Sequence, residues 1–173
     1  MMRDISSHDI KQGVKKTNLR QMVEQEADKR CDNIQEIRHR EIRMSNTSTS
    51  HKLEDFTYST SVTNDHFLQF ITPENKILGF CRLSLPKNME ECQNTAMIRE
   101  VHVYGKVAKI GDEATNAQHM GLGTKLIEEA CKISKESGYS KINVISAICT
   151  RNYYRKRGFE KFSDDGLYQQ KEI

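Results

Sequence analysis

The chain carries Gln118-His119-Met120-Gly121-Leu122-Gly123 at the start of its clearest helical pattern. From residue 121 to residue 137, apolar residues recur on one face, and lysine and glutamate fill the other. Glycine has no Cβ, so a phosphate can approach the backbone closely at Gly121 and Gly123. The first N–H groups of a helix have no partner inside the helix, and the helix dipole is positive there. The stretch therefore predicts an anion site, for which a pyrophosphate is the natural ligand.

Paired glycines before a helix also occur in other nucleotide-binding motifs and in simple tight turns. A dinucleotide fingerprint needs strand, glycine turn and helix in immediate succession, whereas residues 106–117 separate the preceding predicted strand from these glycines. A phosphate-loop NTPase is excluded, because no Gly-Lys-Ser or Gly-Lys-Thr follows. The glycines alone do not identify the ligand, so the sequence around them has to be considered.

Strand and turn patterns surround this helix. Residues 98–104 predict a strand with two valines on one face and Glu100, His102 and Tyr104 on the other. The order of elements implies an α/β fold in which helices pack on a mixed sheet. The remaining predicted elements are a hairpin of strands 67–71 and 77–81 with its turn at 72–76, strands at 56–60, 142–145, 159–162 and 167–170, and a short helix at 152–156.

The N-terminal quarter has a different pattern. Residues 4–43 predict helix, with Leu19, Met22 and Val23 at helical spacing. Residues 46–50 are polar and lack periodicity, which predicts a linker. We therefore expect a helical N-terminal segment over residues 1–44 and a larger domain over residues 51–173.

Three stretches together resemble a known family. Q-x-x-G-x-G opening an amphipathic helix after a strand is similar to the coenzyme A pyrophosphate motif of the GNAT acetyltransferases. R-E-V-H-V-Y-G at residues 99–105 and R-N-Y-Y-R-K at residues 151–156 resemble the acetyltransferase portion of the Elongator catalytic subunit family. The resemblance implies a GNAT fold, in which a mixed, mostly antiparallel sheet splays around an acetyl-CoA site. It also implies an acyltransferase acting in, or derived from, tRNA wobble-uridine modification.

The resemblance and the glycine motif together assign the cofactor-binding residues. In the family, acetyl-CoA lies along the strand before the motif and at the start of the helix. An exposed strand edge can hydrogen-bond the pantetheine amides, and a strand N–H can polarise the thioester carbonyl. The expected cofactor-binding residues are Glu100, Val101, His102, Val103, Gln118, Gly121, Leu122, Gly123, Thr124, Lys125, Asn152 and Tyr154.

Four side chains are candidates for the chemistry itself. Tyr154 is the preferred general acid that protonates the departing thiolate, and Tyr153 is its neighbour and alternative. His102 and Glu100 compete as a general base on the same strand face. The simpler readings stay open: the tyrosines pack, and His102 is a partly buried, hydrogen-bonded side chain.

The sequence also departs from the family. Full-length relatives carry a radical S-adenosylmethionine domain whose iron–sulfur cluster needs three closely spaced cysteines, and the five cysteines here are widely spaced. The chain is therefore a fragment, a partner of a separate radical subunit or other Elongator-like subunits, or a stand-alone descendant. Cys31 and His39 alone do not make a structural zinc site, so we expect neither zinc nor an iron–sulfur cluster. Residues 147–149, Ala-Ile-Cys, replace a glycine-rich stretch of the family and would narrow the acyl pocket.

Composition restricts the compartment and the partners. The chain is 29% charged and 36% hydrophobic, as in soluble proteins, and no apolar stretch predicts a membrane helix. The odd, dispersed cysteines favour a cytoplasmic location, with the nucleus as the alternative. The net charge of the chain is only +3, but basic residues cluster at residues 151–161. This cluster would bind the phosphates of coenzyme A or of tRNA, or it is simply a solvent-exposed charged surface. A tRNA role would draw on Arg20, Arg38, Arg40 and Arg43 in addition to the cluster around Arg155.

Three functions follow from these patterns. The first is an Elongator-type acetyl-CoA-dependent acyltransferase, which binds coenzyme A and tRNA together. The second is a free-standing GNAT N-acetyltransferase that acts on a protein or small amine without tRNA. The third is a non-catalytic RNA-binding or partner-binding module that keeps the fold.

Overall fold

The computed structural model describes residues 11–13, 18–30, 34–42, 50–104 and 121–173. The chain divides into two compact units, Met1–Arg40 and Glu41–Ile173. Glu41 belongs with the second unit because it bridges to Ile77 of the sheet, and Ile42 N–H donates to the Ile77 carbonyl (3.0 Å). The helical pattern predicted for residues 4–43 therefore does not extend to Glu41 and Ile42, and Ile42 contributes to the core of the sheet unit.

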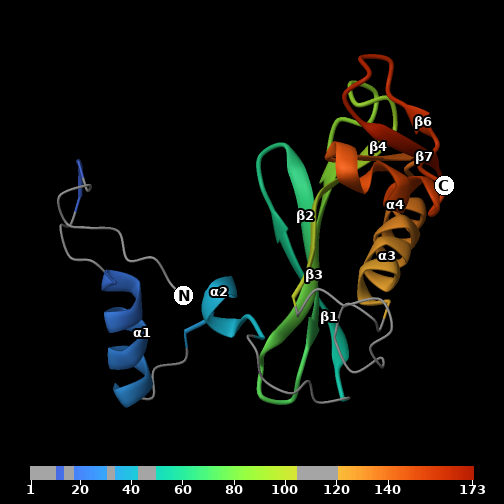
Figure 1. The fold of residues 1–173 in the computed structure, drawn as a ribbon. Helices are drawn as coiled ribbons and strands as arrows, with labels where there is room; N and C mark the ends of the chain where they lie inside the picture. Colours follow the sequence, from blue (N-terminus) through green and yellow to red (C-terminus); the bar gives the residue numbers. More distant parts are fainter. Residues whose placement is uncertain (1–10, 14–17, 31–33, 43–49, 105–120) are drawn as a thin grey trace. The chain divides into compact units, whose positions relative to one another are not determined.

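The described part of the second unit is built on one sheet of seven strands in the order β1-β2-β3-β4-β5-β7-β6. All neighbours are antiparallel except β4 and β5, which are parallel. The expectation of a mixed, mostly antiparallel sheet is thus confirmed (Figure 1). The strands are β1 (Lys52–Ser59), β2 (Thr63–Ile71), β3 (Ile77–Pro86), β4 (Thr95–Val103), β5 (Lys141–Val144), β6 (Lys161–Phe162) and β7 (Gln169–Glu172).

The hairpin of β2 and β3 forms where the turn chemistry predicts it. Asn75, in the turn at residues 72–76, has φ 60°, a left-handed conformation that asparagine tolerates better than most residues. Thr72 N–H donates to the Lys76 carbonyl (2.9 Å) and closes the turn. Both strands are longer than the predicted ranges 67–71 and 77–81. Polar residues such as Thr63 and Asn64 continue the pairing of β2 with β3 beyond the apolar stretches.

Helix α3 (Leu122–Glu136) packs on one face of this sheet, against β2, β3, β4 and β5 (Figure 1). The apolar stripe predicted for it is buried, because Leu122, Leu126, Ile127 and Ala130 are at most 1% exposed. Each fully buried leucine or isoleucine contributes about 1.5–3 kcal/mol relative to an exposed one, so this face holds the helix on the sheet. Gly138, with φ 90°, follows the helix in a left-handed conformation, in which helices commonly end.

The C-terminal part supplies one wall of the site. After β5 the chain forms a 3₁₀ turn, η1 (Ile148–Thr150), and the short helix α4 (Arg151–Arg155). The β6 and β7 pair then returns β7 to the edge of β5. The predicted helix at 152–156 and the final strand pair are confirmed, with the first of those strands reduced to two residues.

The first unit contains two helices in its described residues, α1 (Leu19–Arg30) and α2 (Ile37–Arg40). Residues 11–13 and 34–36 are not helical, so the single helical pattern predicted for 4–43 is wrong in those places. The apolar stripe of α1 is exposed, with Leu19, Met22 and Val23 between 40% and 54% accessible. Its only buried residue is Ala27.

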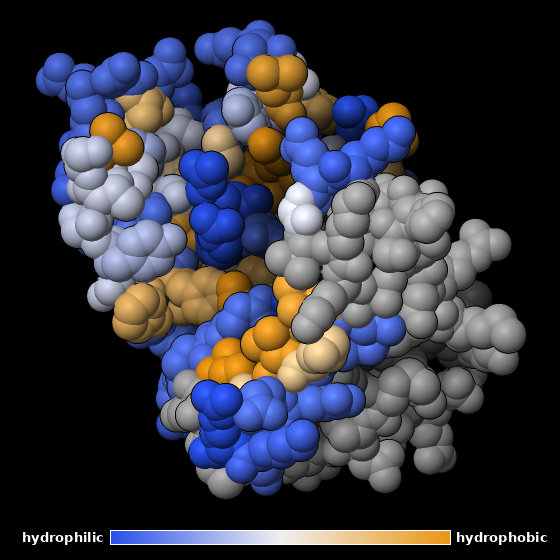
Figure 2. All heavy atoms as spheres, turned by 90° about the vertical axis from the view of Figure 1, so that its left-hand side faces the viewer, coloured by the Kyte–Doolittle hydropathy of each residue, from blue (hydrophilic) through white to orange (hydrophobic). Residues whose placement is uncertain are grey.

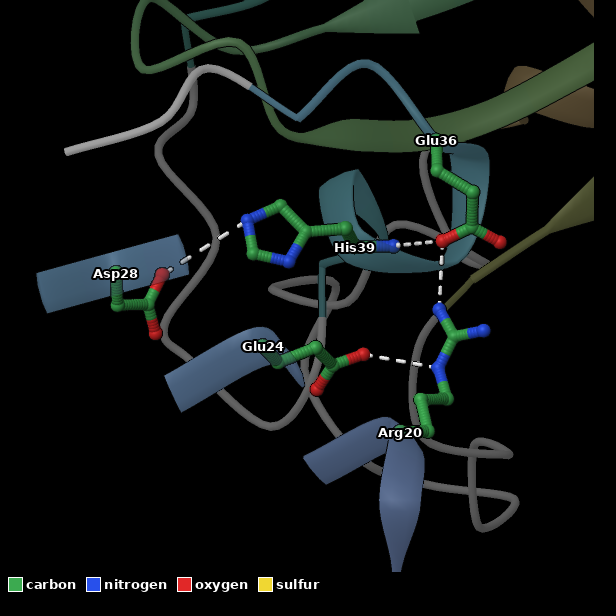
Figure 3. A network of polar contacts seen from close by, with 5 residues as sticks. All are labelled: Arg20, Glu24, Asp28, Glu36 and His39. Carbon is green, nitrogen blue, oxygen red and sulfur yellow. Dashed lines mark hydrogen bonds and ion pairs between the residues drawn. The ribbon is translucent and has the colours of Figure 1, made fainter. Parts of the chain in front are cut away.

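A polar network joins α1 to α2 (Figure 3). Arg20 binds the Glu24 carboxylate at 2.9 Å and the Glu36 carboxylate at 2.6 Å. Glu36 also accepts the backbone N–H of His39 at 3.0 Å, and the His39 ring lies 3.9 Å from Asp28. The hydrogen bond from Arg20 lowers the pKa of the Glu36 carboxyl. Arg20 is thus neutralised locally, which weakens its expected role as a phosphate ligand.

On the face drawn in Figure 2, hydrophobic side chains reach the surface in separate groups between hydrophilic ones. Among the described residues the most exposed large apolar side chains include Phe56, Val62, Ile145 and Ile148. No helix in the described ranges is long and apolar enough to cross a bilayer. The same ranges hold no group of three or more potential metal ligands; Cys31 lies outside them.

Candidate functional site

A cleft of about 540 Å³ opens in the second unit at the start of α3. Three segments form it: the second half of β4, the first turn of α3, and the η1–α4 segment. Its wall is mostly apolar on the strand side and carries hydroxyl and guanidinium groups on the helix side. The lining residues are Val101, Val103, Gly121, Gly123, Thr124, Thr150, Tyr153, Tyr154 and Arg157.

A bulge in β4 turns its valines toward this cleft. Arg82 pairs with Glu100 but the next residue, Leu83, pairs with Ile98, so Arg99 is an extra residue in β4. An extra residue reverses the alternation of side chains along a strand. Val103 consequently faces α3, its Cγ2 lying 3.4 Å from where a Cβ on Gly123 would stand.

The same strand has backbone groups at the cleft that pair with no other strand in the described residues. β4 pairs with β5 only over residues 95–98, so the two strands separate after Ile98. On the other edge, Tyr104 N–H donates to Leu78 of β3. Because backbone groups alternate sides along a strand, the amides of Val101 and Val103 point away from β3. They face the gap that β5 has left, where an extended ligand can pair with them.

The start of α3 is where the glycines predict an anion site. Gly121 has φ 67° and begins the helix in a left-handed conformation that glycine adopts without strain. The first helical hydrogen bonds run from the Thr124 and Lys125 N–H groups to the Gly121 carbonyl, at 3.0 and 3.1 Å. The N–H groups of Leu122 and Gly123 precede them and have no partner within the helix. They lie at the positive end of the helix dipole.

Tyr153 covers Gly123. A Cβ on Gly123 would lie only 2.5 Å from the Tyr153 hydroxyl, so the tyrosine fits only because this residue is glycine. The Arg157 guanidinium stacks on the Tyr153 ring at 3.4 Å from its centroid and donates to the Tyr153 carbonyl at 2.6 Å. Arg157 also donates to the Thr124 hydroxyl from Nε (3.1 Å) and Nη2 (2.5 Å).

Tyr154 is the buried tyrosine of the pair, 8% exposed. Its ring packs edge to face on Tyr153 and on Phe159, with centroids 5.3 and 5.8 Å apart. Burial raises the pKa of its hydroxyl to about 12, with smaller contributions from Tyr153 and Cys81, while Arg157 lowers it. The hydroxyl is therefore protonated at neutral pH and can act as a proton donor but not as a base.

The structure brings together some of the expected cofactor residues and separates others. The side chains of Glu100 and His102 do not line the cleft: Glu100 lies 3.7 Å from Arg82, and the exposed His102 ring stacks on Phe80 and packs at a tilt against Tyr104. Leu122 is buried, Lys125 and Asn152 are exposed and are not part of the cleft lining, and Gln118 lies outside the described residues. The expected cofactor-binding residues that do line the cleft are Val101, Val103, Gly121, Gly123, Thr124 and Tyr154.

Two lining residues were not among the expected cofactor-binding residues. Thr150 immediately precedes the R-N-Y-Y-R-K stretch that carries the resemblance, and its position was therefore available from the sequence. Arg157 appeared only as one charge of the basic cluster. Its spacing of four residues from Tyr153 was a usable signal, because residues four apart at a helix end lie on one face.

The fold agrees with the comparisons to known proteins. The family model described as "Acetyltransferase (GNAT) family" matches residues 31–159. The chain belongs to the GNAT acetyltransferases. GNAT proteins are the acetyl-CoA-dependent class that the Q-x-x-G-x-G stretch at residues 118–123 indicates.

Individual relatives narrow the similarity within the GNAT family. The chain is 33% identical over 172 residues to a tRNA uridine(34) acetyltransferase of Dehalococcoides mccartyi, covering 92% of this chain and 37% of that protein. It is 33% identical over 188 residues to Elongator complex protein 3 of Drosophila melanogaster, covering 100% of this chain and 33% of that protein. The chain thus spans about a third of the length of these relatives.

A solved structure gives the same result. The structure of an N-terminally truncated Elp3 from the archaeon Methanocaldococcus infernus matches with a TM-score of 0.76 and 32% identity, over 100% of this chain and 43% of that one. The expected resemblance to the acetyltransferase portion of the Elongator catalytic subunit is confirmed.

Proposed function

We propose that this chain is an acetyl-CoA-dependent acyltransferase domain of the Elongator type that acts in tRNA wobble-uridine modification. The observation that carries the proposal is the cleft in which the free amides of Val101 and Val103, the start of α3 and the Tyr154 side chain meet. Relatives that are 33% identical to this chain over the aligned residues are named as a tRNA uridine(34) acetyltransferase and Elongator complex protein 3.

The cleft fits the parts of acetyl-CoA in order. The N–H groups of Leu122 and Gly123 would bind the pyrophosphate, as helix starts do in other phosphate sites. The amides of Val101 and Val103 would pair with the pantetheine arm as a neighbouring strand would. An N–H group of β4 aimed at the thioester oxygen would stabilise the charge that develops there during acyl transfer.

Tyr154 would supply the proton in this scheme. When bound, acetyl-CoA provides an activated acyl group whose departing sulfur needs a proton. The Tyr154 hydroxyl, whose pKa lies above an ordinary value that is itself near 10, is protonated across the physiological range and so carries the proton that a general acid needs. The side chains of Glu100 and His102 face away from the cleft, so we assign them no proton transfer.

Binding of tRNA would use the exposed part of the basic cluster. Arg155 and Lys156 are exposed beside the cleft, and neither forms an ion pair with a carboxylate among the described residues. Arg38 is exposed on α2, whereas Arg40 is 8% exposed and Arg43 lies outside the described residues. The uridine chemistry of the relatives would further require a radical S-adenosylmethionine domain or subunit, which we propose as the partner of this unit.

We expect the chain to bind tRNA with an affinity that falls steeply with salt. Contacts between lysine or arginine and phosphate release counterions, so a few such contacts lower affinity about 10- to 100-fold between about 50 and about 200 mM salt. Titration of labelled tRNA at both salt concentrations measures this. Arg155→Gln should flatten the salt dependence, and Lys135→Gln, an equal charge change at the far end of α3, should not. Equal affinities at both salt concentrations would contradict tRNA binding through phosphate contacts. Acetyl-CoA binding is measured in a separate experiment.

A further inference from the structure

Arg157 is the one basic side chain that lines the cleft in the described part of the chain. It follows α4, and its guanidinium reaches across to Thr124 in the first turn of α3. Thr124 lies directly after the two N–H groups that have no partner within the helix. A fixed positive charge and the positive end of a helix dipole are therefore held at the same place, which is the arrangement that binds a phosphate.

The guanidinium still has hydrogen-bonding capacity in this position. Arginine has five N–H donors, and three hydrogen bonds are formed, two to the Thr124 hydroxyl and one to the Tyr153 carbonyl. Two donors therefore remain. No carboxylate in the described ranges forms an ion pair with Arg157, in contrast to Arg20, which contacts Glu24 and Glu36.

The side chain is also held in place before any ligand arrives. The Tyr153 ring lies under the guanidinium at 3.4 Å, and the three hydrogen bonds fix its plane. A positioned guanidinium loses little freedom on binding, and its planar donors match phosphate oxygens. If Arg157 served only to hold α4 against α3, its hydrogen bonds to Thr124 and Tyr153 would be sufficient. That role would not explain why its positive charge lies at the cleft without a carboxylate partner in the described ranges.

We propose that Arg157 binds a phosphate of acetyl-CoA and so makes the site select the full cofactor over the phosphate-free acyl-pantetheine arm. The proposal rests on the proposed function, because it assigns a residue to the same acetyl-CoA cleft. Thr124 and Tyr153 are then positioning residues for Arg157. Such a charge-assisted contact in a partly open cleft is worth about tenfold in affinity.

The test compares two ligands across matched variants. Binding of acetyl-CoA and of S-acetylpantetheine, which has the same thioester arm without phosphates, is measured by calorimetry and competition. Arg157→Gln should weaken acetyl-CoA binding about tenfold and leave S-acetylpantetheine unchanged. Arg157→Lys should retain part of the acetyl-CoA affinity because it keeps the charge. Lys135→Gln, the equal charge change away from the cleft, should alter neither.

The possible outcomes distinguish a failure of the Arg157 assignment from a failure of the proposed acetyl-CoA-binding function. Equal loss for both ligands in Arg157→Gln would make Arg157 only a brace for the cleft wall and would overturn the proposal. Unchanged acetyl-CoA affinity in Arg157→Gln would overturn it as well. If the unaltered chain binds neither ligand, the proposed function itself fails. Thermal unfolding of each variant identifies any general loss of folding. Thr124→Val is a second variant, which keeps the Arg157 guanidinium but removes the hydroxyl that accepts its hydrogen bonds.

Discussion

Replacing Tyr154 with Phe is expected to slow acetyl-CoA turnover about 100- to 10,000-fold, the usual loss when a general acid is removed. The ring and its packing on Tyr153 and Phe159 stay in place, and only the hydroxyl is lost. Affinity for acetyl-CoA should change much less, because one neutral hydrogen bond contributes only about 0.5–1.5 kcal/mol. Turnover and affinity measured on the same preparation test this.

A second variant and a pH profile distinguish the proton donor from a wall residue. Tyr154→Ala should lose both turnover and affinity, because it also removes the buried ring. Since burial raises the Tyr154 pKa to about 12, the unaltered enzyme should show no fall in rate from this group between pH 7 and 10. A fully active Phe variant would end the general-acid role. A Tyr154-dependent fall in rate near pH 10 would instead contradict the raised pKa of this hydroxyl.

Replacing Gly123 with Val is expected to abolish the stabilisation of the chain by acetyl-CoA. A ligand at about 100 times its Kd stabilises the folded state by about 2.7 kcal/mol, which raises the Tm of a chain of this size by roughly 5–10 °C. The valine would cover the N–H groups at the start of α3, and its Cβ would collide with the Tyr153 hydroxyl, 2.5 Å away. Thermal unfolding with and without acetyl-CoA measures the shift.

The collision with Tyr153 needs its own control. Gly123→Ala combined with Tyr153→Phe removes the clashing hydroxyl and leaves the added Cβ with ordinary neighbours, the nearest being Val103 Cγ2 at 3.4 Å. This pair should fold normally and keep a reduced thermal shift. A full shift in Gly123→Val would instead place the pyrophosphate away from α3.

Local patterns predicted most of the second unit. Helix α3 and its buried face follow directly from apolar spacing, and the β2–β3 hairpin follows from its turn residues. The glycines lie where the first N–H groups of α3 have no partner within the helix. These features could be predicted because each depends on neighbours within a few positions along the chain.

Features that depend on distant contacts were missed. Alternation alone gives two faces for residues 98–104, but the bulge at Arg99 decides that Val103 shares the α3 side, and no local signal marks that bulge. The placement of Arg157 depends on Thr124, which is 33 positions away. In the first unit, the apolar spacing of α1 correctly indicated a helix but not burial, because Met22 and Val23 are exposed.

Acetyl-CoA hydrolysis by the purified chain, measured with and without tRNA, tests the central claim most directly. The cleft at α3 and the similarity to tRNA uridine(34) acetyltransferases predict hydrolysis that rises severalfold when tRNA is added. The Tyr154→Phe chain should remain near the uncatalysed rate under both conditions. Absence of acetyl-CoA consumption with and without tRNA, in a folded chain that acetyl-CoA does not stabilise, would contradict the assignment.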